Sequence, residues 1–488
     1  MVLPVLAAYL ALVLGVGLFG HRLFRGTGED YFLASRSIGS FVLVMTLFGT
    51  NMTAFTILGA SGEAYSRGVI VFALMGSSTA IVVPFLIYYL GVRSWQLGKR
   101  HGYVTQIQLV RHRYGSDLLG VLLFVVVVAL MLPYLLIGVK GGGDALAVLS
   151  GGPDGGLPSW VGSLAVCAVT YVYVSYGGMR STSWVNALQT SVFLLFGVAA
   201  YFAVMSESGG LEGAMEQLRA EHAGMADFGS DRFALFQMGS FLLLPLCTGA
   251  FPHLYGHWLS ARSARSFRLA IVAYPLLVAA IWFPSVVLGA AGRLQFDPPL
   301  DGPILVQLIV ANTGEILAGC LAAGVFAAIM SSLDSQILAL GAMFTQDIVR
   351  HHGFHGTLRE ERQVWFGRLF VLAFLALTFL CSLVASQSIF ALGTWALTGF
   401  AGLLPMFAAT LFWRRATTVG AAASILTAAG LWVWFFWDSL SFAGPYSIGG
   451  SGLMPVAVIV PAATASLVIF SLYTRTDRAA GGWWSAAS

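Results

Sequence analysis

The chain has 488 residues, of which 58% are hydrophobic and 9% are charged, and its formal net charge is +4. Its mean hydropathy is +0.83. Soluble globular domains carry about 25% charged residues, so this composition excludes an ordinary soluble protein. The sequence contains no GxxxxGKS/T motif, and direct use of ATP is therefore not expected. Neither a nucleic-acid partner nor an obligate protein partner is expected.

Apolar runs long enough to cross a lipid bilayer recur along the whole chain. A spanning helix needs about 20 apolar residues, and the sequence offers about 13 such runs. We therefore expect an all-α polytopic membrane protein, with the first run retained as a helix and not removed as a signal peptide. The expected spans cover residues 3–24, 38–60, 68–92, 117–140, 158–177, 182–205, 233–256, 269–291, 314–342, 366–387, 391–413, 417–437 and 453–474.

The basic residues give the expected orientation in the plasma (inner) membrane. Cytoplasmic loops of membrane proteins are enriched in Lys and Arg. With the N-terminus outside and the C-terminus in the cytoplasm, most of the 25 Lys and Arg residues fall on the cytoplasmic side. Those on or near the other side are Arg67, Lys140, Arg219, Arg232 and Arg293.

Polar side chains interrupt the apolar run at residues 326–348. Ser331 and Ser332 are adjacent, and Asp334 follows them. A charge at the centre of a membrane helix costs roughly 2.5–3.5 kcal/mol, so such a residue normally faces the bundle interior or a water-filled cavity. Paired hydroxyls beside it suit a small hard cation. The alternative is that both serines bond to carbonyls of the preceding turn and that Asp334 serves a helix–helix contact.

The second span carries small and polar residues at mid-membrane depth. Gly49, Thr50, Asn51 and Thr53 cluster there, and such a segment favours local unwinding that frees carbonyl groups for a cation. The alternative is a seam of small residues between packed helices.

A later span is interrupted in a similar way. Pro245, Gly249 and Pro252 lie in one apolar run, and proline breaks the helical hydrogen-bond ladder. The two interrupted spans begin five spans apart, which is typical of transporters built from two inverted repeats.

Taken in order, these segments resemble the sodium:solute symporter family over residues 30 to about 412. The motifs that carry the resemblance are DYFLASRSIG at 30–39, GTNMT at 49–53, RHRYGS at 111–116, YGGMRSTSWVNALQ at 176–189, FPHLYGHWLSARS at 251–263, and AAIMSSLDSQ followed by TQDI at 327–348.

The resemblance implies a five-plus-five inverted-repeat (LeuT-like) core with one extra helix before it and two after it. The expected divisions are 1–37 for the extra helix and first cytoplasmic loop, 38–206 for the first repeat, 207–232 for an extracellular loop, 233–413 for the second repeat, and 414–488 for two C-terminal helices and a short cytoplasmic tail.

The resemblance also implies a sodium ion and a set of ligands for it. They are the carbonyls of Gly49, Met52 and Ala328 and the hydroxyls of Ser331 and Ser332. Asn186 stands where many relatives carry a carboxylate, which puts a second sodium site in doubt, so one sodium ion per cycle is expected. Asp334 is expected to tune the remaining site.

The substrate is expected to be a small organic solute. Phe55 and Thr56 occupy positions that hold a Glu-Gln pair in sugar-transporting relatives, so a proline-like amino acid or a monocarboxylate fits better than a sugar. For each candidate residue, ordinary packing is the alternative to substrate binding. The candidates are Asn51, Thr53, Phe55, Thr56, Tyr134, Lys140, Gln237, Ser240 and Trp395.

Lys140 ends the fourth expected span, with three glycines after it and Asp144 one turn on. It forms either a surface ion pair with Asp144 or a contact to a substrate carboxylate in an outer vestibule. His253 flanks the third interruption and is a candidate for proton coupling.

We therefore expect a secondary active symporter, not an enzyme, that couples inward sodium flow to solute uptake by alternating access. The alternatives are a proton-coupled or sugar/polyol transporter of the same fold and a transporter-like membrane sensor. Dependence of uptake on sodium at fixed pH separates sodium coupling from proton coupling.

Overall fold

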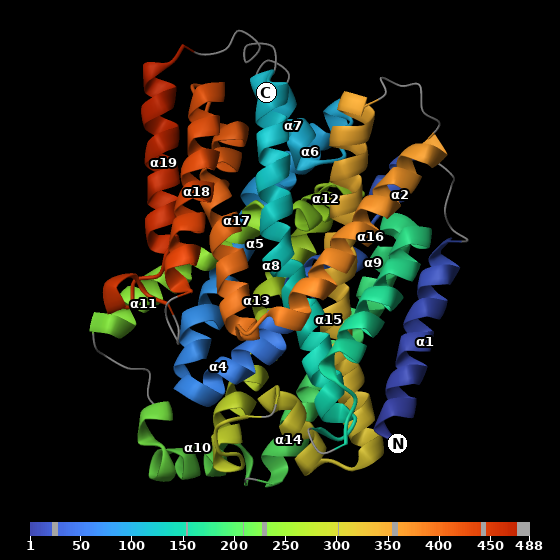
Figure 1. Ribbon diagram of the computed structural model, residues 1–488, viewed down its shortest axis with the longest axis vertical. Helices are drawn as coiled ribbons and strands as arrows, with labels where there is room; N and C mark the ends of the chain where they lie inside the picture. Colours follow the sequence, from blue (N-terminus) through green and yellow to red (C-terminus); the bar gives the residue numbers. More distant parts are fainter. Residues whose placement is uncertain are drawn as a thin grey trace.

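The computed structural model describes residues 1–21, 28–152, 155–207, 209–226, 232–300, 302–353, 360–440 and 446–475. The expected C-terminal tail, beyond residue 475, lies outside the described residues. Within it the protein is helical, and its only β feature is an isolated bridge between Ile38 and Ala261. Figure 1 shows the long helices lying roughly along one another in a single bundle.

The bundle contains the expected number of spans. Ten helices of the described chain are long and apolar enough to cross a membrane, and two bent helix pairs raise the number to 12. Helix α9 (Ser159–Glu207) has 49 residues and breaks at Gly178, where φ is 58° and ψ is −162°. At about 1.5 Å per residue it would be ~73 Å long, enough for two spans. Counting its two halves separately gives the predicted 13.

All other helical elements of the described chain follow in chain order. The remaining elements are α1 (Val2–His21), α2 (Gly28–Leu33), η1 (Ala34–Arg36), α3 (Ser40–Asn51), η2 (Phe55–Gly59), α4 (Ala60–Arg67), η3 (Phe72–Gly76), α5 (Ser77–Leu86), η4 (Ile87–Gly91), α6 (Val92–His101), α7 (Gln106–Tyr114), α8 (Asp117–Leu149), α10 (Gly210–Glu221), η6 (Ala223–Met225), α11 (Arg232–Leu243), η7 (Leu244–Gly249), α12 (Pro252–Ser260), α13 (Ser266–Ala291), η8 (Gly292–Leu294), α14 (Ile304–Asn312), α15 (Glu315–Met343), η9 (Phe344–Gly353), α16 (Glu360–Val384), α17 (Ile389–Phe412), α18 (Thr418–Ser439), η10 (Ile448–Gly450) and α19 (Val456–Tyr473).

The two ends of the bundle differ in the elements that they carry. In Figure 1, α2, α6 and α7 gather at the upper end, whereas α10, α14 and the start of α1 lie at the lower end. These two groups are the ones that the basic residues assign to the cytoplasm and to the outside. The odd number of spans places the start of α1 and the end of α19 at opposite ends of the bundle.

Helices α15 and α17 form the centre of the bundle. In each, 83% of the apolar segment is buried inside the protein, against 22% for α1 and 28% for α18 and α19. The polar residues of α15 therefore face protein and not lipid, as expected for a helix that carries a carboxylate at this depth.

Both predicted interruptions are present. The pair Ser40–Asn51 and Phe55–Arg67 bends by 54°, and Met52 between them is extended. The pair Leu235–Gly249 and Pro252–Ser260 bends by 51°. Phe251 is extended here because the residue before a proline is pushed out of the helical region, and Pro252 itself cannot donate to the ladder.

A hydrogen-bonded bridge joins these two broken helices at the upper end of the bundle. The Ile38 amide donates to the Ser260 carbonyl (3.1 Å), and the Arg262 amide donates to the Ile38 carbonyl (2.9 Å). Arg36 adds a bond from its guanidinium to the Leu259 carbonyl (3.2 Å). The start of α3 is thereby fixed to the end of α12.

The predicted end of the fourth span at Lys140 is wrong. Helix α8 continues through the three glycines to Leu149. A Cβ atom on Gly142 would lie 2.6 Å from the Val166 side chain, and one on Gly143 would lie 2.5 Å from the Ser159 carbonyl. The glycines therefore permit close packing against α9 and do not terminate the helix.

Candidate functional site

The break after α3 lies against the middle of α15. The Ser331 hydroxyl donates to the Gly49 carbonyl (2.9 Å) and also to the Ala328 carbonyl one turn back (3.1 Å). The Ser332 hydroxyl donates to the Ile329 carbonyl (3.0 Å). Both serines are buried. Both serines thus make the hydrogen bonds to the preceding turn that the alternative describes, and Ser331 in addition reaches across to the broken helix.

These oxygens suit a hard monovalent cation. The Ser331 hydroxyl donates to the carbonyls of both Gly49 and Ala328, which brings the three oxygens together. Each oxygen has lone pairs beyond the hydrogen bond that it makes, and hard cations prefer oxygen ligands. Met52, another of the five expected ligand residues, is buried and lies at the extended point of the break.

A buried polar network adjoins this position. The Thr50 hydroxyl lies 2.9 Å from the Ser335 hydroxyl, and His257 Nε2 lies 3.3 Å from the first and 3.0 Å from the second. The Asn186 amide donates to Thr50 (3.0 Å) and to Ser335 (2.8 Å). Asn186 therefore ties α9 to both α3 and α15, and its own Oδ1 has no partner within the described residues.

Asp334 joins the same network from α15. Its carboxylate is fully buried and accepts hydrogen bonds from Ser335 (3.1 Å) and from the Tyr173 hydroxyl on α9 (3.2 Å). A buried carboxylate is costly unless it is hydrogen-bonded or paired with a cation. The network thus places an acidic side chain within one helical turn of Ser331.

Several members of this network were not predicted. Thr50 and Ser335 are sequence neighbours of the predicted Gly49 and Asp334, so adjacency was a usable signal for them. Tyr173 gave no local signal, because its partner is 161 residues away. His253 was predicted as a proton-coupling residue. It is buried with both ring nitrogens unpartnered among the described residues, and its ring lies 4.8 Å from that of Phe251.

A small central cavity lies beside the break in α3. Five predicted substrate residues line it together with Met52, and its volume is about 30 Å³, roughly that of one water molecule. None of the described residues that line it is charged. The five predicted residues are Asn51, Thr53, Phe55, Thr56 and Tyr134.

Three other predicted residues line a different cavity. Lys140, Gln237 and Trp395 face a vestibule of about 850 Å³ between α4, α8, α11 and α17. Ser240 lines neither the vestibule nor the central cavity. Its hydroxyl donates to the Phe236 carbonyl (2.8 Å) and accepts from the Met454 amide (3.0 Å). Its role as a substrate ligand stays a prediction.

Aromatic rings separate the vestibule from the central cavity. Phe55, which lines the cavity, stacks on Phe390, which lines the vestibule, with ring centroids 5.0 Å apart. Trp282 packs at 6.1 Å against the edge of Phe55. A Cβ on Gly393 would lie 2.1 Å from the Phe55 ring, so this glycine makes room for it. We call Phe55, Trp282 and Phe390 the aromatic partition.

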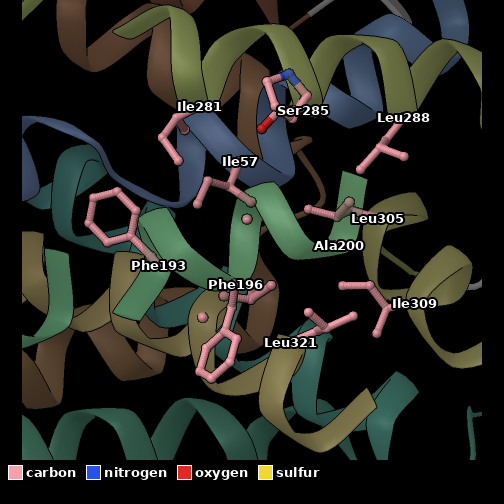
Figure 2. Close-up of a pocket in the computed structure, with 14 residues that line it drawn as sticks. Ile57, Phe193, Phe196, Ala200, Ile281, Ser285, Leu288, Leu305, Ile309 and Leu321 are labelled. Atoms are coloured by element: carbon pink, nitrogen blue, oxygen red, sulfur yellow. The ribbon is translucent and has the colours of Figure 1, made fainter. Parts of the chain in front are cut away.

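A further cavity, shown in Figure 2, has a different character. Its volume is about 20 Å³, and the labelled side chains around it are apolar except for Ser285. It is enclosed by α9, α13 and their neighbours, away from the serines of α15. Its size and lining exclude it as the binding site of a polar solute in this conformation.

The comparison with protein families decides the class. The model for the sodium:solute symporter family matches residues 31–428. The chain belongs to this family. It is therefore a sodium-coupled solute symporter of the membrane and not an enzyme, as the sequence motifs predicted.

Relatives in the family align along nearly the whole chain. A sodium/pantothenate symporter of Escherichia coli is 27% identical over 469 residues, which cover 93% of this chain and 94% of that protein. A sodium/proline symporter of Haemophilus influenzae is 25% identical over 461 residues and 87% of each chain.

Solved structures of other transporters share the fold of this family member. A sodium-coupled sialic acid symporter in an outward-open state has a TM-score of 0.76 at 18% identity and covers 97% of this chain and 98% of its own. MhsT in complex with L-phenylalanine has a TM-score of 0.58 at 13% identity and covers 89% of this chain and 98% of its own. These similarities confirm the predicted five-plus-five, LeuT-like architecture.

Proposed function

We propose that this symporter imports a small organic carboxylate, of the pantothenate or proline kind, together with one sodium ion. The relatives that align along most of the chain are named for pantothenate and for proline, and both molecules carry a carboxylate. The central cavity offers such a solute amide and hydroxyl groups beside aromatic rings.

The ion site that we propose consists of Gly49, Met52, Ala328, Ser331 and Ser332. The contact between the Ser331 hydroxyl and the Gly49 carbonyl supports it most directly, because it brings the two expected walls together. Met52 also lines the central cavity. An ion that fixes the backbone at Gly49–Met52 therefore shapes the substrate cavity, and the coupling is reciprocal: each ligand raises affinity for the other by the same factor.

Asp334 tunes the sodium site in this proposal without ligating the ion. Its charge reaches the site through Ser335 and Thr50, whose hydroxyls lie 2.9 Å apart. Asn186 is neutral and donates to the same hydroxyls, which supports a stoichiometry of one sodium ion per cycle.

The orientation in this proposal is N-terminus outside and C-terminus in the cytoplasm, in the inner membrane of a bacterial-type cell. The vestibule then opens to the outside, and the repeats span residues 38–206 and 233–413. The first helix of each repeat is the broken one, which supports this division. The proposed transport cycle requires no protein partner.

Uptake into proteoliposomes tests the ion site. Purified protein is supplied with labelled pantothenate or proline, with sodium or potassium outside. Ser332→Ala removes one ligand, and the sodium concentration for half-maximal uptake is expected to rise about tenfold, the effect of roughly 1.4 kcal/mol.

Ser382→Ala is the matched control, because the Ser382 hydroxyl also bonds to a carbonyl three residues back (2.6 Å) but lies on α16 outside the network. An unchanged sodium dependence in Ser332→Ala would contradict the site. Sodium-driven uptake of neither carboxylate would contradict the substrate class.

A further inference from the structure

Helix α1 lies outside both proposed repeats, at the edge of the bundle beside α9 (Figure 1). Only 22% of its apolar segment is buried, so most of its surface is available to lipid. The buried residues Leu6, Tyr9, Val13 and Gly17 recur at intervals of three or four. Residues with this spacing share one face of a helix. This face packs against α9 and α15, the helices that supply most of the buried polar network.

Close contacts fix α1 against both of these helices. A Cβ atom on Gly17 would lie 2.8 Å from the Tyr173 side chain, and one on Gly319 of α15 would lie 2.8 Å from that of Val5. The Ser181 hydroxyl on α9 donates to the Gly17 carbonyl (2.5 Å). Small residues thus let the backbones approach closely, as they do between other membrane helices. These contacts set the depth of every side chain on the buried face of α1.

Tyr9 carries the only polar side chain of this helix between Val2 and Phe19. Its hydroxyl is buried and lies near Gln189 of α9 and Asp334 of α15. Among the described residues this hydroxyl makes no hydrogen bond, and neither amide atom of Gln189 makes one. Buried polar atoms nearly always have a partner. Two unpartnered polar groups beside a carboxyl group therefore indicate that the three act together.

Asp334 has room for a further hydrogen-bond donor. Its Oδ1 accepts from Ser335 (3.1 Å) and its Oδ2 from the Tyr173 hydroxyl (3.2 Å). A carboxylate offers about four lone-pair sites, and none of the ion pairs between described residues includes Asp334. Neutral donors must therefore stabilise this buried group. The Tyr9 hydroxyl, which also lies near Tyr173, is a donor that no described residue engages.

The orientation of Asp334 matters for the proposed ion site. The carboxyl group lies within one helical turn of Ser331, and Ser335 connects it to Thr50 beside Gly49. Electrostatic interactions in the protein interior are strong and depend on distance. A donor that holds the carboxyl group in one orientation therefore changes the affinity for a cation at Gly49 and Ser331.

We propose that α1 serves the ion site, and that Tyr9 and Gln189 are positioning residues for Asp334. The Tyr9 hydroxyl accepts a hydrogen bond from the Gln189 amide and donates one to the carboxyl group. The carboxyl group thereby keeps the orientation in which it stabilises the bound ion. Neither positioning residue touches the ion or the solute. This role gives a function to a helix outside the repeats, and it rests on the proposed ion site.

Thermal stabilisation by sodium tests this role without a solute or a transport step. A ligand that binds the folded state raises its melting temperature according to concentration and affinity. Purified full-length protein in detergent is titrated with sodium against choline at constant ionic strength. The readout is the sodium concentration that produces a given rise in melting temperature. Tyr9→Phe removes only the hydroxyl and is expected to raise this concentration about fivefold, the effect of one ordinary hydrogen bond.

Two variants serve as controls for packing. Tyr171→Phe removes a different hydroxyl, which donates from α9 to the Arg368 carbonyl on α16 (3.5 Å). Val13→Ala loosens the buried face of α1 one turn from Tyr9 and keeps the hydroxyl. Both are expected to leave the sodium requirement unchanged. Val13→Ala should lower the melting temperature in choline, because it removes buried methyl groups. A purely structural role of α1 would affect only that temperature.

The variant Asp334→Asn decides whether Tyr9 acts through Asp334. Effects of residues that act through one another are not additive. In the Asp334→Asn background, Tyr9→Phe is therefore expected to change the sodium requirement less than twofold. A further fivefold rise in that background would overturn the positioning role.

Two other results would also overturn it. One is an unchanged sodium requirement in Tyr9→Phe where Ser332→Ala raises it, which would leave the ion site standing. The other is an equal rise in Val13→Ala, which would assign the effect to packing and not to the hydroxyl. Absence of any sodium stabilisation in the wild type would contradict the proposed ion site itself, and this inference with it. Sodium-driven uptake remains the separate test of the proposed function.

Discussion

The network around α15 and the vestibule contain similar chemical groups under opposite conditions. Asp334 is fully buried and is held by Ser335 and Tyr173. Asp144 is 26% exposed and pairs with Lys140 on its own helix. Charge interactions are strong at a buried position and weak in contact with water. Substitutions of charged groups are therefore expected to have larger effects in the buried network than in the vestibule.

The largest effect is expected from Asp334→Asn, which keeps the shape of the side chain and removes its charge. The sodium concentration for half-maximal uptake should rise about 100-fold, since hydrogen bonds to a charged group contribute about 1.5–3 kcal/mol. Sodium titration of proteoliposome uptake measures it. Asp438→Asn is the control, because that carboxylate bonds Tyr446 near the exposed end of α18. If Asp438→Asn raised the half-maximal sodium concentration as much as Asp334→Asn does, the effect would not be specific to the buried network.

An intermediate effect is expected at the aromatic partition. Gly393→Ala places a methyl group where Phe55 now lies, so the ring must move. The maximal uptake rate should fall about tenfold because overpacking costs roughly 1–3 kcal/mol. Phe55→Leu in the same chain should restore much of the rate by freeing the space. A double variant as slow as Gly393→Ala alone would show that the two residues do not act together.

The smallest effect is expected at the aromatic surface of the vestibule. Trp395→Leu should raise the KM for the carboxylate about threefold with little change in the maximal rate, because an aromatic contact contributes about 0.5–1.5 kcal/mol. Initial rates at saturating sodium give both constants. A rise in KM of about 100-fold, as large as the effect expected for Asp334→Asn, would contradict the expected difference between the vestibule and the ion network.

The sequence was sufficient for features that depend on local chemistry. The length of the apolar runs predicted the spans, and Pro245, Pro252 and the small residues at 49–53 predicted both helix breaks. The family motifs led to the pairing of Gly49 with Ser331, which the structure shows as a hydrogen bond.

Features that depend on tertiary packing could not be predicted in the same way. Three glycines after Lys140 suggested a helix end, yet they pack against α9 and η2 within a continuous helix. The bond from Tyr173 to Asp334 and the engagement of Ser240 by Met454 join residues far apart in the sequence. The division of the substrate residues between two cavities likewise follows from how α8, α11 and α17 meet.

The bridge between Ile38 and Ser260–Arg262 has a consequence for the speed of the cycle. It fastens the two broken helices to each other at the end opposite the vestibule, through two hydrogen bonds between backbone groups. In the proposed orientation this is the cytoplasmic end, and release of solute there is expected to require these bonds to break. The Arg262 side chain beside them is exposed and is not among the residues proposed to bind the ion or the solute. We therefore expect substitutions of Arg262 to change the rate of turnover while leaving the affinities for sodium and for solute unchanged.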